Sequence, residues 1–239
     1  MNVSFKGKVV LITGCTKGIG KKLFTKFKSL GAYVIGTSKT IELKRKNYEI
    51  IRADFTSNSS TQNFIKILKK IKKIDILINN AGINKISHIS KVDSLDVNNI
   101  INVNLIAPIL ITKEVSIKMM KKNKGKIINI SSIFGKVSKE KRSVYASTKH
   151  AINGLTKTLA LDLAANNILV NSVSPGVIET PLTRKVLGQS GIDKMKKEIP
   201  LKKLGKTEDV ANLILFLASQ YNSYITGQNY IIDGGYVVK

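Results

Sequence analysis

Short apolar runs alternate with amphipathic segments along the whole chain, and this alternation limits the fold more than any other feature of the sequence. Seven runs are continuous and rich in Val, Ile and Leu, as buried strands are, and the segments between them carry apolar residues at helical spacing. Continuous apolar strands separated by helices are typical of a parallel sheet covered on both faces. The sequence therefore predicts a doubly wound α/β fold, with helices on both faces of about seven strands. The expected strands are 8–13, 33–37, 49–53, 75–79, 125–130, 169–173 and 229–232, and the expected helices are 18–30, 64–71, 97–121, 144–165 and 209–219.

The domain organisation follows from what the sequence lacks. The 239 residues contain no repeat, no low-complexity tract and no linker, and the four prolines are not clustered. A chain of this length can bury roughly 70–75% of the surface that it exposes when unfolded, so it needs no disulfide to be stable. We therefore expect one domain covering residues 1–239.

The net charge of +25 raises the question of a nucleic-acid partner, because fixed positive charge attracts phosphate. All but four of the 40 basic residues are lysines, however, and they are scattered over every amphipathic segment. Recognition of bases and phosphates favours the bidentate guanidinium of arginine. A compositional drift toward Lys, Ile and Asn explains the charge more simply. We expect no nucleic-acid partner, although the charge would attract anionic ligands such as a phosphorylated cofactor.

Metal sites, membrane spans and export signals have little support. The single cysteine, Cys15, excludes an internal disulfide, and two histidines argue against a histidine-rich metal site. No stretch reaches about 18 consecutive apolar residues, so we expect no membrane partner. The first residues have no apolar signal core, which favours a cytoplasmic protein.

A glycine-rich segment follows the first expected strand. Residues 13–20 read T-G-C-T-K-G-I-G, with glycines at 14, 18 and 20. Glycines allow a tight turn and a close approach of the backbone to a pyrophosphate, whose charge then lies at the N-terminus of a helix. An ordinary strand–helix turn could look the same. The position directly between the first strand and the first helix favours a dinucleotide-binding loop.

The end of the second expected strand indicates which dinucleotide binds. Sites selective for NAD usually place a carboxylate there, on the ribose 2′-hydroxyl. This chain has Thr37, Ser38 and Lys39 instead, and no carboxylate before Glu42. Hydroxyls and ammonium groups bind a 2′-phosphate, and Lys17 in the glycine loop adds a second positive charge. The pattern predicts NADP(H), unless Lys17 and Lys39 are merely two more solvated lysines.

A candidate catalytic pair lies in the helix expected at 144–165. Tyr145 and Lys149 are spaced i and i+4, so they share one helical face. A neighbouring ammonium stabilises a phenolate, which lets Tyr145 exchange a proton with a substrate oxygen. In a chain so rich in lysine this spacing arises by chance. Its context supports it, because Ser132 follows the fifth strand, at the edge where open α/β sheets bind ligands.

Further motifs follow in order: Asn79-Asn80-Ala81-Gly82 after the fourth strand, Asn104 in Asn-Val-Asn-Leu, and Pro175-Gly176 after the sixth strand. With the glycine loop and the Ser…Tyr-x-x-x-Lys set, these make the sequence resemble the short-chain dehydrogenase/reductase family. The likeness runs from Lys8 to Tyr236 and is to the single-domain type similar to 3-oxoacyl-acyl-carrier-protein reductases. It implies a Rossmann-like fold and an enzyme that transfers a hydride between NADP(H) and a carbonyl or secondary alcohol.

The resemblance also implies residue roles. Tyr145 would be the general acid/base, Ser132 would orient the substrate oxygen, and Lys149 would lower the pKa of Tyr145 and hold the nicotinamide ribose. Asn104 would hold a water that extends the proton relay. The implied cofactor-binding residues are Gly14, Thr16, Lys17, Gly18, Ile19, Gly20, Thr37, Ser38, Asp54, Phe55, Asn80, Ala81, Gly82, Tyr145, Lys149, Pro175, Gly176, Ile178 and Thr180, with no metal ligand.

Three features depart from the carrier-protein reductases. The segment between the second and third expected strands is short and leaves little room for the usual helix. Residues 136–143 are highly charged where those enzymes are small and uncharged, and Asn166 stands where they often carry a basic residue. The first hypothesis is an NADPH-dependent ketoreductase of a small-molecule substrate, with 3-oxoacyl thioesters, free or bound to a carrier protein, as the leading substrate class. A phosphorylated substrate, or a sugar, sugar nucleotide or polyol, is the alternative. A non-catalytic dinucleotide- or nucleic-acid-binding protein is the third.

The long helices carry more apolar positions than one sheet face should cover. Ile106, Ile109, Ile111, Val115 and Met119 are examples on the helix expected at 97–121. Relatives in the family that this chain resembles pair such helices between subunits. We therefore expect a homotetramer or a homodimer.

Overall fold

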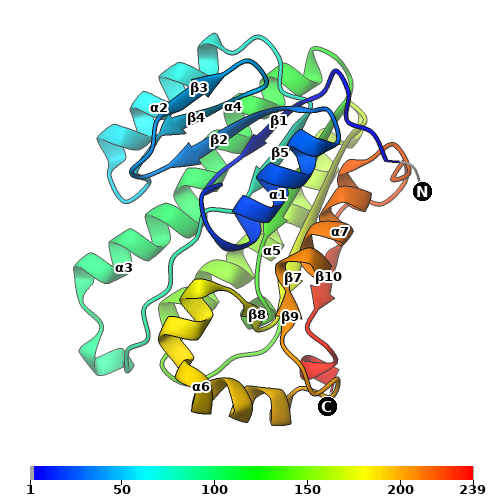
Figure 1. The fold of residues 1–239 in the computed structure, drawn as a ribbon. Coiled ribbons are helices and arrows are strands. Elements are labelled where there is room, and N and C mark those ends of the chain that lie inside the picture. The colour runs from blue at the N-terminus through cyan, green and yellow to red at the C-terminus, as the bar shows by residue number, and fades with distance from the viewer. Residues whose placement is uncertain (1–2, 239) are drawn as a thin grey trace.

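The computed structural model describes residues 3–238 and is built on a central sheet of eight strands in the order β10-β7-β6-β5-β1-β2-β4-β3 (Figure 1). Every neighbouring pair is parallel except β3 with β4. The carboxyl ends of the parallel strands therefore meet at one edge. The strands are β1 (Val9–Ile12), β2 (Tyr33–Ser38), β3 (Leu43–Arg45), β4 (Tyr48–Arg52), β5 (Ile76–Asn79), β6 (Gly125–Ile130), β7 (Ile168–Pro175) and β10 (Asn229–Ile232).

Helices cover both faces of this sheet, as the sequence predicts. α1 and α7 contact each other on one face, and α2, α4 and α5 lie on the other (Figure 1). β8 (Ile178–Glu179) and β9 (Gly205–Lys206) form a separate two-stranded sheet. The helices are α1 (Gly18–Ser29), α2 (Asn58–Lys70), α3 (Ser94–Ile101), α4 (Ala107–Met120), α5 (Ser143–Ala164), α6 (Pro181–Glu198) and α7 (Thr207–Ala218), with short turns η1 (Ile89–Lys91), η2 (Asn102–Ile106), η3 (Ile133–Gly135) and η4 (Tyr236–Val238).

Two apolar cores form because successive side chains of a strand point to opposite faces. In β1, Ile12 packs in the core beneath α1 and α7, whereas Leu11 packs in the core beneath α2 and α4. Phe27 of α1 and Phe64 of α2 are both almost completely buried, one in each core. The alternation of the sheet thus explains why strands so uniformly apolar need helices on both sides.

α3, η2 and α4 follow one another without a break from Ser94 to Met120. By length and composition this helix could cross a membrane, although half of its most apolar window is buried inside the fold. Ile111 and Met119 lie in the core beneath the sheet. The packing is that of a core helix.

Several elements differ from the sequence prediction. The short segment between β2 and β4 has no helix, as expected, but it forms an antiparallel edge strand, β3, that was not predicted, and neither were β8 and β9. α2 begins at Asn58 rather than Phe64, because the Ser57 side chain caps it by accepting a hydrogen bond from the Ser60 amide at 3.3 Å. α6 was not predicted: it has no regular apolar stripe, and its backbone breaks at Gly188, where φ is 61°.

The expected apolar excess on the long helix divides between two roles. Ile111, Val115 and Met119 are buried in the core, so they need no partner subunit to cover them. Ile106 and Ile109 are 40% and 38% exposed. The expectation was therefore wrong for three of its five examples, because the helix packs against α2 as well as against the sheet.

Candidate active site

The glycine loop needs its glycines for steric reasons. Gly14 and Gly18 have φ values of 68° and 52°, in the left-handed region that side chains rarely adopt. A Cβ atom at Gly20 would clash with the carbonyl oxygen of Gly14. One at Gly14 would lie 3.1 Å from the Cα of Ala81. The loop is therefore pressed closely against the segment that follows β5.

Thr13 and Asn80 hold these two segments together. The Thr13 hydroxyl accepts hydrogen bonds from the amides of Asn80 and Ala81, at 2.9 and 3.0 Å. In return, the Asn80 side-chain amide donates to the carbonyls of Thr13 and Gly14, at 2.8 and 3.0 Å. Both donors of Asn80 are thus used to position the loop, and Thr13 was not among the predicted site residues.

The N-terminus of α1 is open to an anion. No side chain caps it, its first turn has no acidic residue, and the exposed Lys17 stands at the N-cap position. The first amides of a helix lack partners within the helix and carry a partial positive charge. The free amides and Lys17 are donors for a pyrophosphate, and the glycines allow it to approach the backbone closely. The loop, which also contains Thr16 and Ile19, therefore fits a dinucleotide.

Side chains at the end of β2 have two different roles. Thr37 is buried and accepts a hydrogen bond from the Gly14 amide at 3.0 Å, so it supports the glycine loop from below. The Ser38 hydroxyl accepts from the amides of Thr40 and Ile41, at 3.3 and 3.2 Å, which turns the chain after the strand. Both side chains are buried, so both hydroxyls hold the backbone around the end of β2 in place.

Asp54, after β4, forms an ion pair with Lys39, after β2, with 2.8 Å between Nζ and the carboxylate. Burial acts to raise the pKa of Asp54, but hydrogen bonds from Lys39 and Thr56 outweigh it and hold that pKa below its usual value. Lys39 is therefore already engaged beside the expected adenosine site. The neighbouring Phe55 packs its ring against Phe64 in the core, so only its backbone can face a cofactor.

Tyr145 and Ser132 come together at the carboxyl end of β6. Ser132 caps η3, where its hydroxyl accepts from the Phe134 amide at 3.2 Å, and its side chain lies close to that of Tyr145. Burial raises the pKa of Tyr145, and the neighbouring Ser132 hydroxyl and the charge of Arg142 offset part of this rise. A phenol and a hydroxyl placed in this way can share one carbonyl oxygen between them.

Lys149 is a buried ammonium directly beside Tyr145. Its Nζ donates to the carbonyl of Ile130 at 2.8 Å and lies 5.5 Å from the centre of the Tyr145 ring. Burial lowers its pKa to about 8. A Cβ atom on Gly82 would lie 3.7 Å from this Nζ, so the Asn-Asn-Ala-Gly segment passes directly over it.

Asn104 is held in a turn of π-helix, η2, a distortion that often marks functional sites. Its carboxamide accepts from the Ile83 amide at 2.8 Å and donates to the Ile83 carbonyl at 2.9 Å and to Thr148 at 3.2 Å. Asn104 thus fixes the loop after Gly82 and the turn of α5 that carries Lys149. The structure therefore places Asn104 beside Gly82 and beside the turn of α5 that carries Lys149.

The segment after β7 closes the opposite side. The Gly176 amide donates to the Ile232 carbonyl at 2.9 Å, and a Cβ atom there would strike Asp233, so Pro175-Gly176 turns tightly against β10. The following residues run back toward the glycine loop: Ile178 is buried, and Thr180 caps α6. A Cβ atom on Gly18 would lie 3.4 Å from the Thr180 methyl group. The structure thus brings both halves of the expected cofactor site together.

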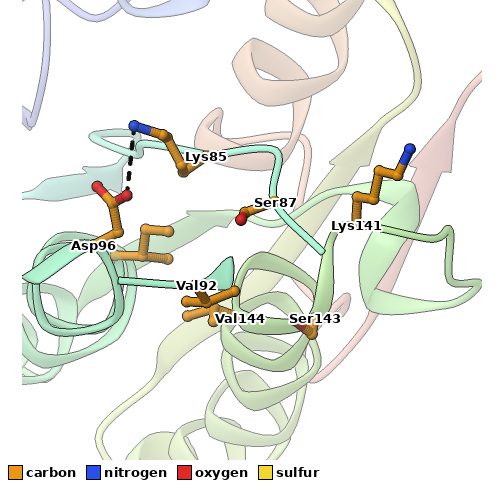
Figure 2. A pocket seen from close by; sticks show the side chains of 8 residues that line it. Lys85, Ser87, Val92, Asp96, Lys141, Ser143 and Val144 are labelled. Atoms are coloured by element: carbon orange, nitrogen blue, oxygen red, sulfur yellow. Dashed lines mark ion pairs between the residues drawn. The ribbon is translucent and has the colours of Figure 1, made fainter. Parts of the chain in front are cut away.

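A small cavity of about 10 Å³ lies beside this centre, between the start of α5 and the segment 85–100 (Figure 2). Val92 and Val144 both line it, and Figure 2 shows the Lys85–Asp96 ion pair at one side. None of the four candidate catalytic residues lines it, and it is too small for a substrate.

Replacing Lys149 with Met should stabilise the fold at neutral pH. The pKa of Lys149 falls from 10.5 to about 8 on folding, so at pH 7 the folded protein carries a buried charge that costs up to about 3 kcal/mol. Loss of the hydrogen bond to Ile130 offsets about 1 kcal/mol, which leaves an expected gain of about 1–2 kcal/mol. The unfolded chain binds more protons between pH 8 and 10.5, so wild-type stability rises across that window and the gain disappears. Urea unfolding at pH 7 and pH 10.5 measures both values.

The matched control is Lys157→Met, which removes an exposed ammonium from the same helix and should show no such dependence on pH. A Lys149→Met protein less stable than wild type at pH 7 would show that the buried ammonium does not strain the fold.

Comparisons with known proteins agree with this geometry. A family model described as enoyl-(acyl carrier protein) reductase matches residues 14–237. The 3-oxoacyl-[acyl-carrier-protein] reductase FabG of Aquifex aeolicus (strain VF5) is 38% identical and aligns over 98% of this chain and 99% of its own. Among solved structures, ElxO with NADP bound is 36% identical, with a TM-score of 0.88 over 97% of this chain and 99% of its own. A 4-hydroxyisoleucine dehydrogenase complexed with NADH is 31% identical, with a TM-score of 0.91 over 98% of this chain and 100% of its own.

The match to the family model covers almost the whole chain, and the relative from Aquifex aeolicus matches from end to end. The glycine loop, the Asn-Asn-Ala-Gly segment, Ser132, Tyr145 and Lys149 lie together at the carboxyl edge of a parallel sheet, as the motif order predicts. The chain belongs to the short-chain dehydrogenase/reductase family of oxidoreductases.

Proposed function

We propose that this protein transfers a hydride between NADP(H) and a carbonyl or secondary alcohol, with Tyr145 as the general acid/base. The observation that carries the proposal is the contact of Tyr145 with Ser132 above the buried ammonium of Lys149. The glycine loop, which fits a dinucleotide, lies on the far side of Gly82. A non-catalytic binding protein has no need of this set.

Each residue has a distinct task in the proposed reaction. Ser132 and Tyr145 hold the substrate oxygen between their hydroxyls, and Tyr145 gives its proton to that oxygen as the carbonyl is reduced. Lys149 stabilises the phenolate that remains, because a cation within a few ångströms favours the ionised form. The nicotinamide supplies the hydride, or accepts it in the reverse direction. Asn104 and the Ile83 backbone that it holds form part of the route by which Tyr145 regains its proton after the reduction.

The substrate class follows the relatives first. FabG of Aquifex aeolicus is by name a reductase of 3-oxoacyl chains on a carrier protein, so we propose a 3-oxoacyl thioester as the first substrate to test. A turnover screen that follows NADPH absorbance, with acyl thioesters beside keto-sugars, decides between this class and carbohydrates. We further propose that the protein works in the cytoplasm, where NADPH and carrier-bound acyl chains are available.

Tyr145→Phe keeps the packing of the ring and removes its exchangeable proton. General acid/base groups contribute about 10²- to 10⁴-fold, so turnover should fall at least 100-fold while cofactor affinity changes little. Ser132→Ala should lower turnover less, since Ser132 orients the oxygen without supplying the proton. Lys149→Met should weaken both turnover and cofactor binding. Steady-state kinetics and fluorescence titration of NADPH measure the pattern, and near-normal turnover by Tyr145→Phe would contradict it.

Ser38→Asp should shift cofactor preference from NADPH toward NADH. A carboxylate at the end of β2 repels a 2′-phosphate and accepts a hydrogen bond from a 2′-hydroxyl. We expect the ratio of the two dissociation constants, measured by fluorescence, to change at least ten-fold. Ser29→Asp, an exposed substitution at the end of α1, is the control for added charge. Equal affinity of the wild type for both cofactors would remove the phosphate argument.

We propose a homotetramer, or at least a homodimer, paired through α4 and α5. Ile106 at the end of η2 and Ile109 and Ile117 of α4 are 38–40% exposed, and Leu161 of α5 is 80% exposed. Light scattering at micromolar concentration should give a multiple of the chain mass of 26.3 kDa. Leu161→Glu should lower that mass, whereas Leu95→Glu on α3 should not. A wild-type monomer under these conditions would end the proposal.

A further inference from the structure

Arg142 is a charged side chain that the proposed reaction does not use. It stands at the N-cap of α5, three residues before Tyr145, at the end of the charged loop 136–142. Its guanidinium lies 6.0 Å from the centre of the Phe134 ring, and that ring meets Tyr145 edge-on, with 6.3 Å between ring centres. Arginine, phenyl ring and phenol thus form one row along the wall of the site.

The guanidinium is turned inward without a partner. Its Nε and Nη1 atoms are covered by the protein, and no acceptor within residues 3–238 reaches either of them. Buried polar groups in folded proteins nearly always find a hydrogen-bond partner, and a buried charge without one costs several kcal/mol. Burial correspondingly lowers the pKa of Arg142. The unpaired guanidinium of Arg142 is therefore unusual for a folded protein.

No carboxylate among the described residues is paired with this charge. Asp96, Glu179 and Asp233 each have other partners: Asp96 forms an ion pair with Lys85, Glu179 pairs with Arg184, and Asp233 accepts from the amides of Gly235 and Val237. None of the ion pairs found across residues 3–238 includes Arg142. The positive charge beside Tyr145 is therefore left for something outside the chain.

The backbone holds Arg142 in this inward position. Lys141, directly before it, has a φ of 62°, and its carbonyl accepts a hydrogen bond from the Ser87 amide at 3.2 Å. Figure 2 shows the Lys141 ammonium pointing away from the other side chains that line the cavity. Adjacent cations of one loop thus point in different directions, and only Arg142 packs against the catalytic row.

We propose that Arg142 binds an anionic group of the substrate, a carboxylate or a phosphate, close to the carbonyl that Tyr145 serves. The inference rests on the proposed function of this site, and within it favours carbonyl compounds with a negative charge near the reacting carbon over the neutral 3-oxoacyl thioesters that the relatives suggest. A guanidinium matches both anions with paired N–H donors. The side chain as a whole is half-buried, so an anion can meet its exposed part, and a small movement of the protein around Nε and Nη1 would bring these N–H groups into use.

A binding experiment tests this without turnover. The enzyme is first saturated with NADP⁺, and malonate and inorganic phosphate are then titrated by calorimetry at 150 mM salt. At least one of these anions should bind the wild type. Lys141→Gln is the control: it removes the same charge from the neighbouring exposed position, and it should bind that anion as well as the wild type does. Arg142→Gln should weaken that binding at least ten-fold, with Arg142→Lys between them. Equal binding by Arg142→Gln, or no binding of either anion by the wild type, would overturn the proposal.

A kinetic experiment separates the sources of the anion and separates this inference from the proposed function. Acetoacetate is compared with the neutral 3-oxobutanoyl thioester of N-acetylcysteamine, and dihydroxyacetone phosphate with dihydroxyacetone. We expect a higher kcat/KM for the charged member of at least one pair, mainly through KM, and loss of that preference in Arg142→Gln. If the neutral member is preferred in both pairs, the anion proposal fails while the proposed reductase function stands. Without any turnover the reductase proposal fails, and the binding experiment alone decides the role of Arg142.

Stability gives an independent readout. If Arg142 awaits an anion, Arg142→Met should raise the melting temperature of the protein in a buffer without carboxylate or phosphate, because an apolar side chain replaces an unpaired buried charge. In wild type, malonate or phosphate should raise the melting temperature of the NADP⁺-loaded enzyme, and Arg142→Met should abolish this effect. A lower melting temperature of Arg142→Met in the anion-free buffer would show that Arg142 stabilises the folded state, and it would contradict the proposal.

Discussion

The buried ammonium of Lys149 is the constraint on which the rest of the site depends. A charge withdrawn from water needs a fixed acceptor, and the Ile130 carbonyl at the end of β6 provides one at 2.8 Å. This bond fixes the rotation of α5 against the sheet, and with it the position of Tyr145 one turn earlier. The positions of Lys149 and Tyr145 therefore depend on where β6 ends.

Around this charge, loops from distant parts of the chain are tied to one another by hydrogen bonds. Thr13 and Asn80 join the loops after β1 and β5, and Asn104 joins the latter to α5. Each bond links segments that are more than twenty residues apart. A cofactor on the glycine loop and a substrate at Tyr145 thus meet a surface whose parts move together, which a hydride transfer over a short distance requires.

Much of this arrangement could be predicted from the sequence, because strand and helix patterns place their carboxyl-end residues at one edge. The glycine loop, Ser132, Tyr145 and Lys149 were found in this way. The Thr13–Asn80 bonds could not be predicted, since pairing between residues 67 apart leaves no local signal. The inward orientation of the Arg142 side chain could not be predicted either, because in the sequence Arg142 is one of several cations in a loop. α6 could not be predicted because it has no apolar stripe. Its buried Ile192 packs with Ile199 and Leu204, which follow the helix in the sequence.

The central claim is that Tyr145 is a proton-transferring phenol whose ionisation depends on Lys149. Its titration can be followed by ultraviolet difference spectroscopy of the NADP⁺-bound enzyme, with Tyr145→Phe as the reference that isolates this phenol from the other six tyrosines. The account predicts that the pKa of Tyr145 is lower in wild type than in Lys149→Met, by at least one unit for a cation within a few ångströms. The same pKa in both proteins would contradict it.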